Sequence, residues 1–392
     1  MPDLALSLGF RFEDLYASEG LARIDAAFAA RVAATDPGLA ARLADARKAP
    51  ASLEPKAESE LLIALARPLE DFIAELFSIR APLSALQSAQ DELAPLYACK
   101  RLFVQRRAAK AHKAEDAARF DVQALEAELG RLLGGAVEEM AFARGVLAWL
   151  DAESEHAAAL DAALRYAAWA ALTDAGRARW GKGLLFKVPR KVDPAHLIEM
   201  EAIDHCGATA FQGPRAHLRA REGFALTDHG TDLKGALDEA NYCIWCHAQA
   251  KDSCSKGLKD RKTGAFQKSA HGVPLAGCPL EEKISEMHSL KVEGVPIGAL
   301  AVAIVDNPML AGTGHRICND CMKACIYQKQ EPVNIPQAET RILKDVLELP
   351  WGFEVYSLLT RWNPLNLKLP VAKPASGRRV LVAGLGPAGY TL

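Results

Sequence analysis

The sequence predicts a mainly α-helical protein, with a helical bundle over residues 1–190, a cysteine-rich helical domain over 191–372 and the start of an α/β domain over 373–392. Three observations predict this order. Apolar residues recur at helical spacing through the first part. Seven of the nine cysteines lie between Cys243 and Cys325, and a short apolar run near the end leads into three spaced glycines.

Composition narrows the class of protein. A chain of 392 residues, 50% of them hydrophobic, can bury a sizeable core, and its net charge of -2 gives no reason to expect a nucleic-acid partner. Residues 1–5 lack the basic and apolar parts of a secretion signal, and no apolar run is long enough to span a membrane. We therefore expect a cytoplasmic protein whose thiols stay reduced and available to metal.

The first 190 residues are predicted to form an α-helical bundle of unknown role. One apolar stripe at helical spacing consists of Leu61, Leu65, Leu69, Phe72, Ile73 and Leu76. Pro68 interrupts this stripe, and we expect it to kink or split the helix because proline removes a helix hydrogen bond. Further helices are predicted near residues 121–140 and 153–172. Cys99 is predicted to be a small core residue.

The clustered cysteines are the main functional signal. They form two groups, which are Cys243, Cys246, Cys254 and Cys278, followed by Cys318, Cys321 and Cys325. The order C-x2-C, a single Cys, a Cys-Pro pair and C-x2-C-x3-C is typical of thiolates that hold iron–sulfur clusters. Zinc ribbons space two C-x2-C pairs by about 15–20 residues, whereas far more sequence intervenes here. The pattern favours two clusters over a single cluster, structural zinc or unmetallated thiols.

The last part of the sequence predicts the start of a Rossmann-type domain. An apolar run at residues 380–383 precedes a G-x-G-x-x-G pattern, which places a dinucleotide pyrophosphate at a helix N-terminus. The candidate cofactor-binding residues are Gly384, Gly386, Pro387, Ala388 and Gly389. The acidic residue expected about 20 residues further on is not reached. We therefore expect the dinucleotide domain to be truncated here, and the alternative is an ordinary strand–turn–helix.

Several motifs in order carry a family resemblance. They are Gly277-Cys278-Pro279-Leu280, Asn307-Pro308, the stretch from Gly314 to Cys325, Glu331-Pro332-Val333-Asn334-Ile335, Glu339 and the final glycine motif. With them, residues 236–392 resemble the small subunit of glutamate synthase and the N-terminal part of dihydropyrimidine dehydrogenase. In that family a helical domain with two [4Fe-4S] clusters precedes FAD-binding and NADPH-binding domains.

The resemblance implies a function and a set of partners. It implies the electron-transfer portion of an FAD-dependent NAD(P)H oxidoreductase with iron–sulfur clusters, for which this chain would be an incomplete fragment. The FAD site would be incomplete, and NAD(P)H would bind a missing C-terminal domain. An electron-acceptor protein or a large subunit is the implied partner. The clusters and the flavin would carry out the electron chemistry, and the protein would position and tune them.

The resemblance also implies ligand sets that cross between the cysteine groups. One cluster would take Cys243, Cys246, Cys254 and Cys325, and the other would take Cys278, Cys318, Cys321 and a non-cysteine ligand at Glu339. The chain departs from the family in an insert at residues 255–277, which we expect to loop out, and in the short spacing before Cys321. A solvated helix carboxylate is the alternative for Glu339, because carboxylate is a hard ligand among soft thiolates.

A second hypothesis comes from a different functional class. The chain would be a non-catalytic adaptor, in which the helical bundle docks a partner and a metal only stabilises the fold. Asp204-His205-Cys206 could suggest a nucleophile and a base, but neighbours in sequence seldom point at one another. The basic residues between Lys100 and Lys113 are predicted to form a solvated helix face.

Overall fold

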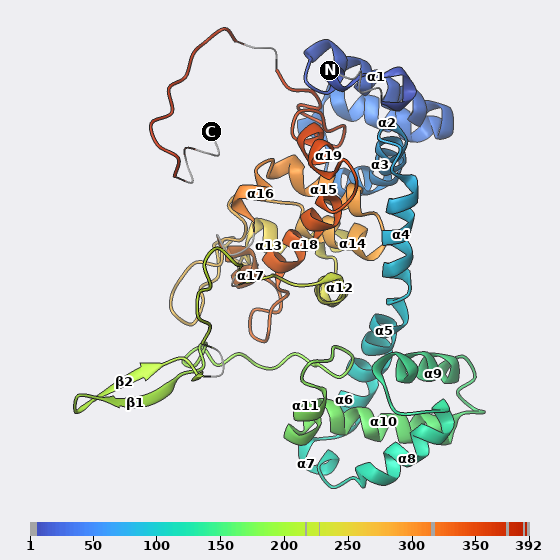
Figure 1. Cartoon of the computed structure of the whole chain (residues 1–392), viewed down its shortest axis with the longest axis vertical. Coiled ribbons are helices and arrows are strands. Elements are labelled where there is room, and N and C mark those ends of the chain that lie inside the picture. Colours follow the sequence, from blue (N-terminus) through green and yellow to red (C-terminus); the bar gives the residue numbers. More distant parts are fainter. Residues whose placement is uncertain are drawn as a thin grey trace.

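The computed structural model describes residues 6–215, 218–226, 228–314, 318–373, 376–386 and 389. The fold is mainly α-helical, which confirms the prediction, and the described residues contain one two-stranded sheet. Two groups of helices are joined through α4 (Arg80–Asp91) and α5 (Ala94–Cys99), as Figure 1 shows. Among the described helices, none has the length and apolar character that crossing a membrane requires.

The first group combines helices from the N-terminal and C-terminal parts of the chain. Its helices are α1 (Ser18–Thr35), α2 (Pro37–Lys48), α3 (Pro55–Leu76), α4, α13 (Ser253–Lys256), α14 (Ile284–Val292), α15 (Pro296–Asp306), α16 (Leu310–Thr313), α17 (Asp320–Ala324), α18 (Ile335–Leu347) and α19 (Gly352–Leu359). One hydrophobic core joins them. This core therefore combines the N-terminal helices with the cysteine-rich region.

Helix α3 carries the predicted apolar stripe into this core. All six residues of the stripe are buried, as expected. The helix continues through Pro68, so the predicted split is not observed. A proline inside a helix costs about 3 kcal/mol, whereas burying one large apolar side chain contributes about 1.5–3 kcal/mol. Packing of the stripe therefore outweighs the local cost of the proline.

The contact between α3 and α15 is close. A β-carbon at Gly298 would lie 2.8 Å from the Ala66 β-carbon, so only glycine lets the two helices approach this far. At the start of α15, the buried Glu70 carboxylate accepts the backbone N–H of Ile297 at 2.8 Å. This contact caps a helix N-terminus with a side chain from another helix. It ties the N-terminal helices to the domain that carries the cysteines.

The second group forms a separate core. Its helices are α5, a π-helix at Lys100–Ala108, α6 (Ala109–Ala111), α7 (Ala114–Ala117), α8 (Val122–Leu133), α9 (Glu139–Asp151), α10 (Ala157–Leu172) and α11 (Asp174–Trp180). Aromatic rings fill it, and the Phe186 centroid lies 5.1 Å from Phe142 and 5.0 Å from Trp180. Cys99 is fully buried here, which confirms its core assignment. The predicted helix at residues 121–140 is divided between α8 and α9.

Helix α12 (Leu233–Tyr242) connects the two groups. Lys100 is buried and donates to the Asp238 carboxylate on α12 at 2.6 Å, so the prediction of a solvated position is wrong for this lysine. Tyr97 donates its hydroxyl proton to the Lys234 carbonyl at 2.6 Å. Each core thus contains residues from both sides of residue 190, where the composition changes. The predicted domain boundaries stay a prediction.

Two segments extend from the helices. Strands β1 (Glu201–His205) and β2 (Ala208–Gln212) form an antiparallel hairpin that projects from the molecule (Figure 1). Cys206 is exposed at its turn, and the Asp204 carboxylate accepts the backbone N–H of Gly207 at 3.0 Å. Asp204 thus has a turn-forming role in this sequence triplet.

The described residues near the C-terminus extend away from the helices (Figure 1). Residues 380–383 form no strand, and Val380 and Leu381 are 75% and 92% exposed. A buried Rossmann strand needs neighbouring strands on both sides, and the described residues supply none. The α/β domain therefore stays a prediction.

Candidate metal centre formed by two cysteine-lined cavities

The first cavity brings together four thiols from distant parts of the chain. It is lined by Cys243, Cys246, Cys254 and Cys325. Its remaining walls are largely apolar, and they include Ile244, Ile284, Ile326, Tyr327, Val333 and Ile335. The four thiols therefore share a cavity whose walls are largely apolar.

The second cavity contains the remaining three clustered cysteines. It is lined by Cys278, Cys318, Cys321 and Glu339, together with Pro279, Leu280, Glu282, Asn307, Thr313, Gly314 and Pro336. The structure thus divides the eight predicted ligand residues into the same two sets of four that the family resemblance implies.

The two cavities adjoin each other at two places. On the short helix α17, Cys321 faces the second cavity, whereas Cys325 directly follows the helix and faces the first. The second link is a backbone hydrogen bond of 2.8 Å from the Cys278 N–H to the Cys254 carbonyl, which joins one residue of each cavity. Helix α17 also packs on α13, which carries Cys254. The crossed grouping of the cysteines therefore follows from the path of the chain.

The insert between Cys254 and Cys278 leaves the domain and returns, as predicted. Leu258 and Leu275 are joined by a backbone hydrogen bond of 2.9 Å near its base. Gly277 has a φ of +81°, and a β-carbon there would lie 2.6 Å from the backbone nitrogen of Gly257. A glycine at this position therefore allows the two ends of the insert to meet, and it sets both cysteines in place.

Backbone N–H groups point at several of the sulfur atoms. Trp245, whose φ of 53° lies in the left-handed region, donates its N–H to the Cys243 sulfur. The Cys278 sulfur accepts N–H groups from Leu280 and Glu282, and the Cys325 sulfur accepts those of Tyr327 and Val333. Such donors stabilise a thiolate and tune a bound cluster. The arrangement fits metal-bound thiolates better than inert core thiols.

Burial opposes ionisation of these thiols in the protein alone. It raises the pKa of Cys243 to about 12 and the pKa values of Cys246 and Cys278 to about 11. Neighbouring thiols and carboxylates add to the effect through like-charge repulsion. A cation bound among the sulfur atoms would reverse this balance, because metal binding deprotonates thiols. The donor set therefore fits a positively charged inorganic centre.

Glu339 lies on α18 and is 7% exposed. It hydrogen bonds with the buried Glu282 carboxyl, and burial together with Glu282 raises the pKa of Glu339 to about 9. A β-carbon at Gly314 would lie 2.8 Å from a Glu339 carboxyl oxygen, so glycine lets the chain pass over this group. The alternative of a solvated carboxylate is therefore wrong, whereas metal ligation by Glu339 stays a prediction.

Sequence reasoning missed two buried polar residues beside the thiols. Glu282 lines the second cavity, and His288 lines the first. His288 is fully buried, which lowers its pKa to about 4. Neither residue belongs to a recognised motif. Glu282 lies four residues after Cys278, whereas His288 is a single histidine in a helix of mixed polar and apolar residues.

No group of three or more His, Cys, Asp or Glu side chains in the described ranges is arranged to hold a metal ion. A tetrahedral zinc site has metal–sulfur bonds of about 2.3 Å and thus sulfur atoms about 3.8 Å apart. A multi-iron cluster holds its thiolates further apart, because iron and sulfide atoms lie between them. Two clusters therefore stay a prediction for these cavities.

The predicted dinucleotide site is not assembled in the described residues. Gly384 has a φ of +111°, and a β-carbon at Gly386 would meet no atom within 4 Å. Pro387 and Ala388 lie outside the described residues. Gly389 is described, and it lines neither of the two cysteine-lined cavities. Dinucleotide binding by this segment stays a prediction.

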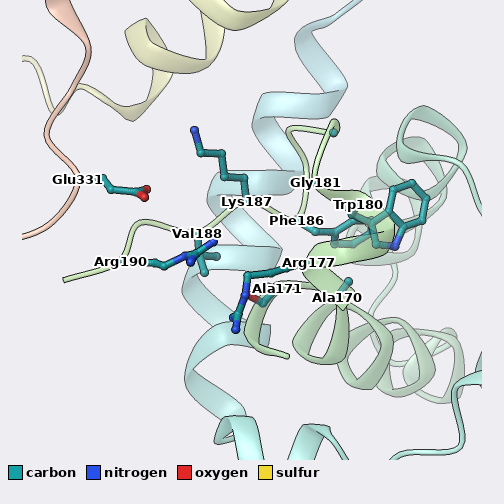
Figure 2. Close-up of a pocket in the computed structure, with 11 residues that line it drawn as sticks. Ala170, Ala171, Arg177, Trp180, Gly181, Phe186, Lys187, Val188, Arg190 and Glu331 are labelled. Atoms are coloured by element: carbon teal, nitrogen blue, oxygen red, sulfur yellow. The ribbon is translucent and has the colours of Figure 1, made fainter. Parts of the chain in front are cut away.

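A further pocket lies beside the second helical group (Figure 2). Its basic side chains are Arg177, Lys187 and Arg190, and Glu331 faces them from a separate segment. Arg177 donates to the Leu172 carbonyl at 2.7 Å, and the Glu331 N–H donates to the Arg190 carbonyl at 2.9 Å. These contacts join two parts of the chain and indicate a structural junction.

Fold and site together define a mainly helical, cysteine-rich protein with two adjoining thiol-lined cavities. Residues 6–78 match a family described as the RP005 N-terminal alpha-helical domain. The chain is 30% identical over 303 residues to the uncharacterized protein RP005 of Rickettsia prowazekii (strain Madrid E), covering 74% of this chain and 98% of RP005. It therefore belongs to the RP005 family.

A second relative comes from the same organism. The chain is 63% identical over 84 residues to the uncharacterized protein RP006, which corresponds to 21% of this chain and 12% of RP006. The chain thus spans about one eighth of the length of RP006 and nearly all of RP005. No solved structure matches the chain.

Proposed function

We propose that this chain is the electron-transfer portion of an FAD- and NAD(P)H-dependent iron–sulfur oxidoreductase, with one [4Fe-4S] cluster in each cavity. The observation that carries the proposal is the division of seven cysteines and Glu339 between two adjoining cavities. This division agrees residue by residue with the ligand sets that the resemblance to the glutamate synthase small subunit implies.

A bound [4Fe-4S] cluster supplies a site that accepts and releases one electron at a time. The thiols of the first cavity would hold it, and the surrounding isoleucine and tyrosine side chains would limit the access of water. Backbone N–H groups at Cys243 and Cys325 offset part of the negative charge on sulfur. Because α17 contributes to both cavities, electrons would have a short path between the two centres.

The flavin and nicotinamide parts of the proposal rest on the glycine motif and on the family resemblance. They require a complete dinucleotide domain. Residues 373–392 contain neither the second strand nor the acidic residue of such a domain. The implied partner is an electron-acceptor protein or a large subunit. A longer protein containing the whole domain should bind FAD stoichiometrically. Gly386→Val in that protein should abolish binding by blocking the approach of the backbone to the phosphates.

Metal analysis tests the central part of the proposal. Purified without oxygen, the chain should be brown and contain about eight iron atoms and about eight sulfides, as expected for two four-iron clusters. Cys206→Ser is a matched control, because Cys206 is exposed on the hairpin and lines neither cavity. A colourless protein that holds zinc or no metal would instead support the adaptor hypothesis.

A further inference from the structure

His288 is a buried polar side chain whose ring nitrogens lack a partner. It lies on α14, is 0% exposed, and lines the first cavity beside the four cysteines. Neither Nδ1 nor Nε2 has a hydrogen-bond partner in the described part of the protein. Leaving a buried donor unpaired costs about 1–3 kcal/mol. The arrangement therefore indicates a partner that occupies the cavity.

The position of His288 on its helix supports this interpretation. Ile284 and Ser285 line the same cavity, and His288 follows them by four and three positions, so all three share one face of α14. Ser285 is already engaged, because its hydroxyl contacts the His247 ring and accepts the His247 backbone N–H at 3.0 Å. The Ser285 hydroxyl is therefore already bonded to His247. Among these three residues, only the His288 ring has a polar group without a protein partner in the described part of the chain.

The chemistry of the cavity determines which role His288 can have. Four thiols already line the space, which is the full ligand set of a [4Fe-4S] cluster. A neutral imidazole carries one N–H donor, and sulfur atoms are the acceptors that a cluster offers. Among the residues that the structure describes, no histidine lines the second cavity, where Glu339 takes the place of a fourth thiol. The first cavity therefore has an imidazole donor that the described lining of the second cavity lacks.

We propose that His288 donates an N–H hydrogen bond to a sulfur atom of the cluster in the first cavity and thereby raises its reduction potential. The inference rests on the proposed function and extends it, because it assigns a tuning residue to one of the two centres. A donor near the cluster stabilises the reduced form, which carries more negative charge. His288 is a positioning and tuning residue in this role and is not a ligand.

Substitution of His288 tests the inference through the reduction potential. His288→Leu has a similar size and no donor, and it should make reduction of the first cluster about tenfold less favourable, which is about 59 mV for one electron. The second cluster in the same molecule should keep its potential. His288→Asn and His288→Gln retain a donor at the positions of Nδ1 and Nε2, and one of them should restore the wild-type value. His205→Leu, on the exposed hairpin, is the matched control.

A measurement on the unaltered protein avoids dependence on how the variants fold. With ¹⁵N-labelled histidine, pulsed EPR of the reduced protein should detect one weakly coupled nitrogen, and His288→Leu should remove it. Absence of that signal, or an unchanged potential in His288→Leu with both clusters assembled, would overturn the inference. A strong coupling typical of direct iron ligation would overturn it as well. If the wild-type chain binds no iron, the proposed function fails with it, whereas the other negative results leave that function intact.

Discussion

Cys318 and Cys321 differ in exposure yet face the same cavity. Cys318 is exposed and Cys321 is 8% exposed, and both line the second cavity with Cys278. Cys318→Ser and Cys321→Ser should each therefore remove one cluster and leave the other detectable. Iron content should fall from about eight to about four atoms per chain.

The exposed Cys318 gives the cleaner of these two tests, because replacing it leaves the packing of α17 unchanged. Cys206→Ser should retain all iron, since that thiol lies in the hairpin turn. If both cavity variants keep the wild-type iron content, the assignment of these residues to a cluster is wrong.

Substitutions at Glu339 can separate the effect of losing a metal ligand from the effect of losing a buried side chain. Glu339→Ala should lower the iron content or shift the potential of the second cluster, because it removes a buried oxygen beside three thiols. Glu339→Cys should retain that cluster, since a thiolate is softer than a carboxylate and is the usual ligand. EPR spectra and iron counts check both variants. Indistinguishable spectra for the wild type and Glu339→Ala would show that the carboxyl does not act on the cluster.

At the scale of elements, the loop base at Gly277 holds Cys254 and Cys278 together. Gly277→Ala forces a β-carbon to within 2.6 Å of a backbone nitrogen at a φ of +81°. The left-handed conformation alone costs a residue with a side chain about 1–2 kcal/mol, and the clash adds to this cost. We expect loss of stability and of bound iron, measured by denaturant unfolding and metal analysis.

Gly272 provides a matched control for Gly277 within the same insert. It has a φ of +78°, but a β-carbon there would meet no atom within 4 Å. Gly272→Ala should therefore cost only the conformational term and should keep both clusters. Equal iron content in the two alanine variants would mean that the loop base does not position the cysteines.

The sequence predicted the helical elements better than their packing partners. The stripe from Leu61 to Leu76 identified the buried face of α3, because a period of 3.6 depends only on which side is apolar. Periodicity could not tell that this face packs on α15, more than 200 residues later in the chain. For the same reason the sequence could not exclude a split of the helix at Pro68, which the packing of α3 prevents.

The sequence predicted those residues of the candidate site that belong to recognisable motifs. Spacing identified the seven clustered cysteines, and the family resemblance supplied their division into two sets. Glu282 and His288 have no motif, and only the fold brings them to the cavities. The close approach of Gly314 to Glu339 is likewise a property of three-dimensional packing.

At the scale of the whole molecule, the two hydrophobic cores predict two separable unfolding events. Cys254, Cys321 and Cys325 belong to the first core, whereas the second core contains none of the seven clustered cysteines. Because metal binding is coupled to folding, iron removal should destabilise the first group of helices, which holds the cavities. The second body should keep its stability, because its core is filled by aromatic rings such as Phe142 and Phe186.

Calorimetry of the intact and chelator-treated protein checks this expectation. For a body of roughly 200 residues, each kcal/mol of lost stability lowers Tm by about 2–4 °C, so a loss of a few kcal/mol gives a shift of roughly 10 °C. The first transition should move by this amount while the second stays in place. The buried ion pair of Lys100 and Asp238 connects the two helical groups at α12 and couples their unfolding. A single transition that shifts on iron removal would contradict two separable unfolding events. It would show that the molecule unfolds as one cooperative unit in spite of its two cores.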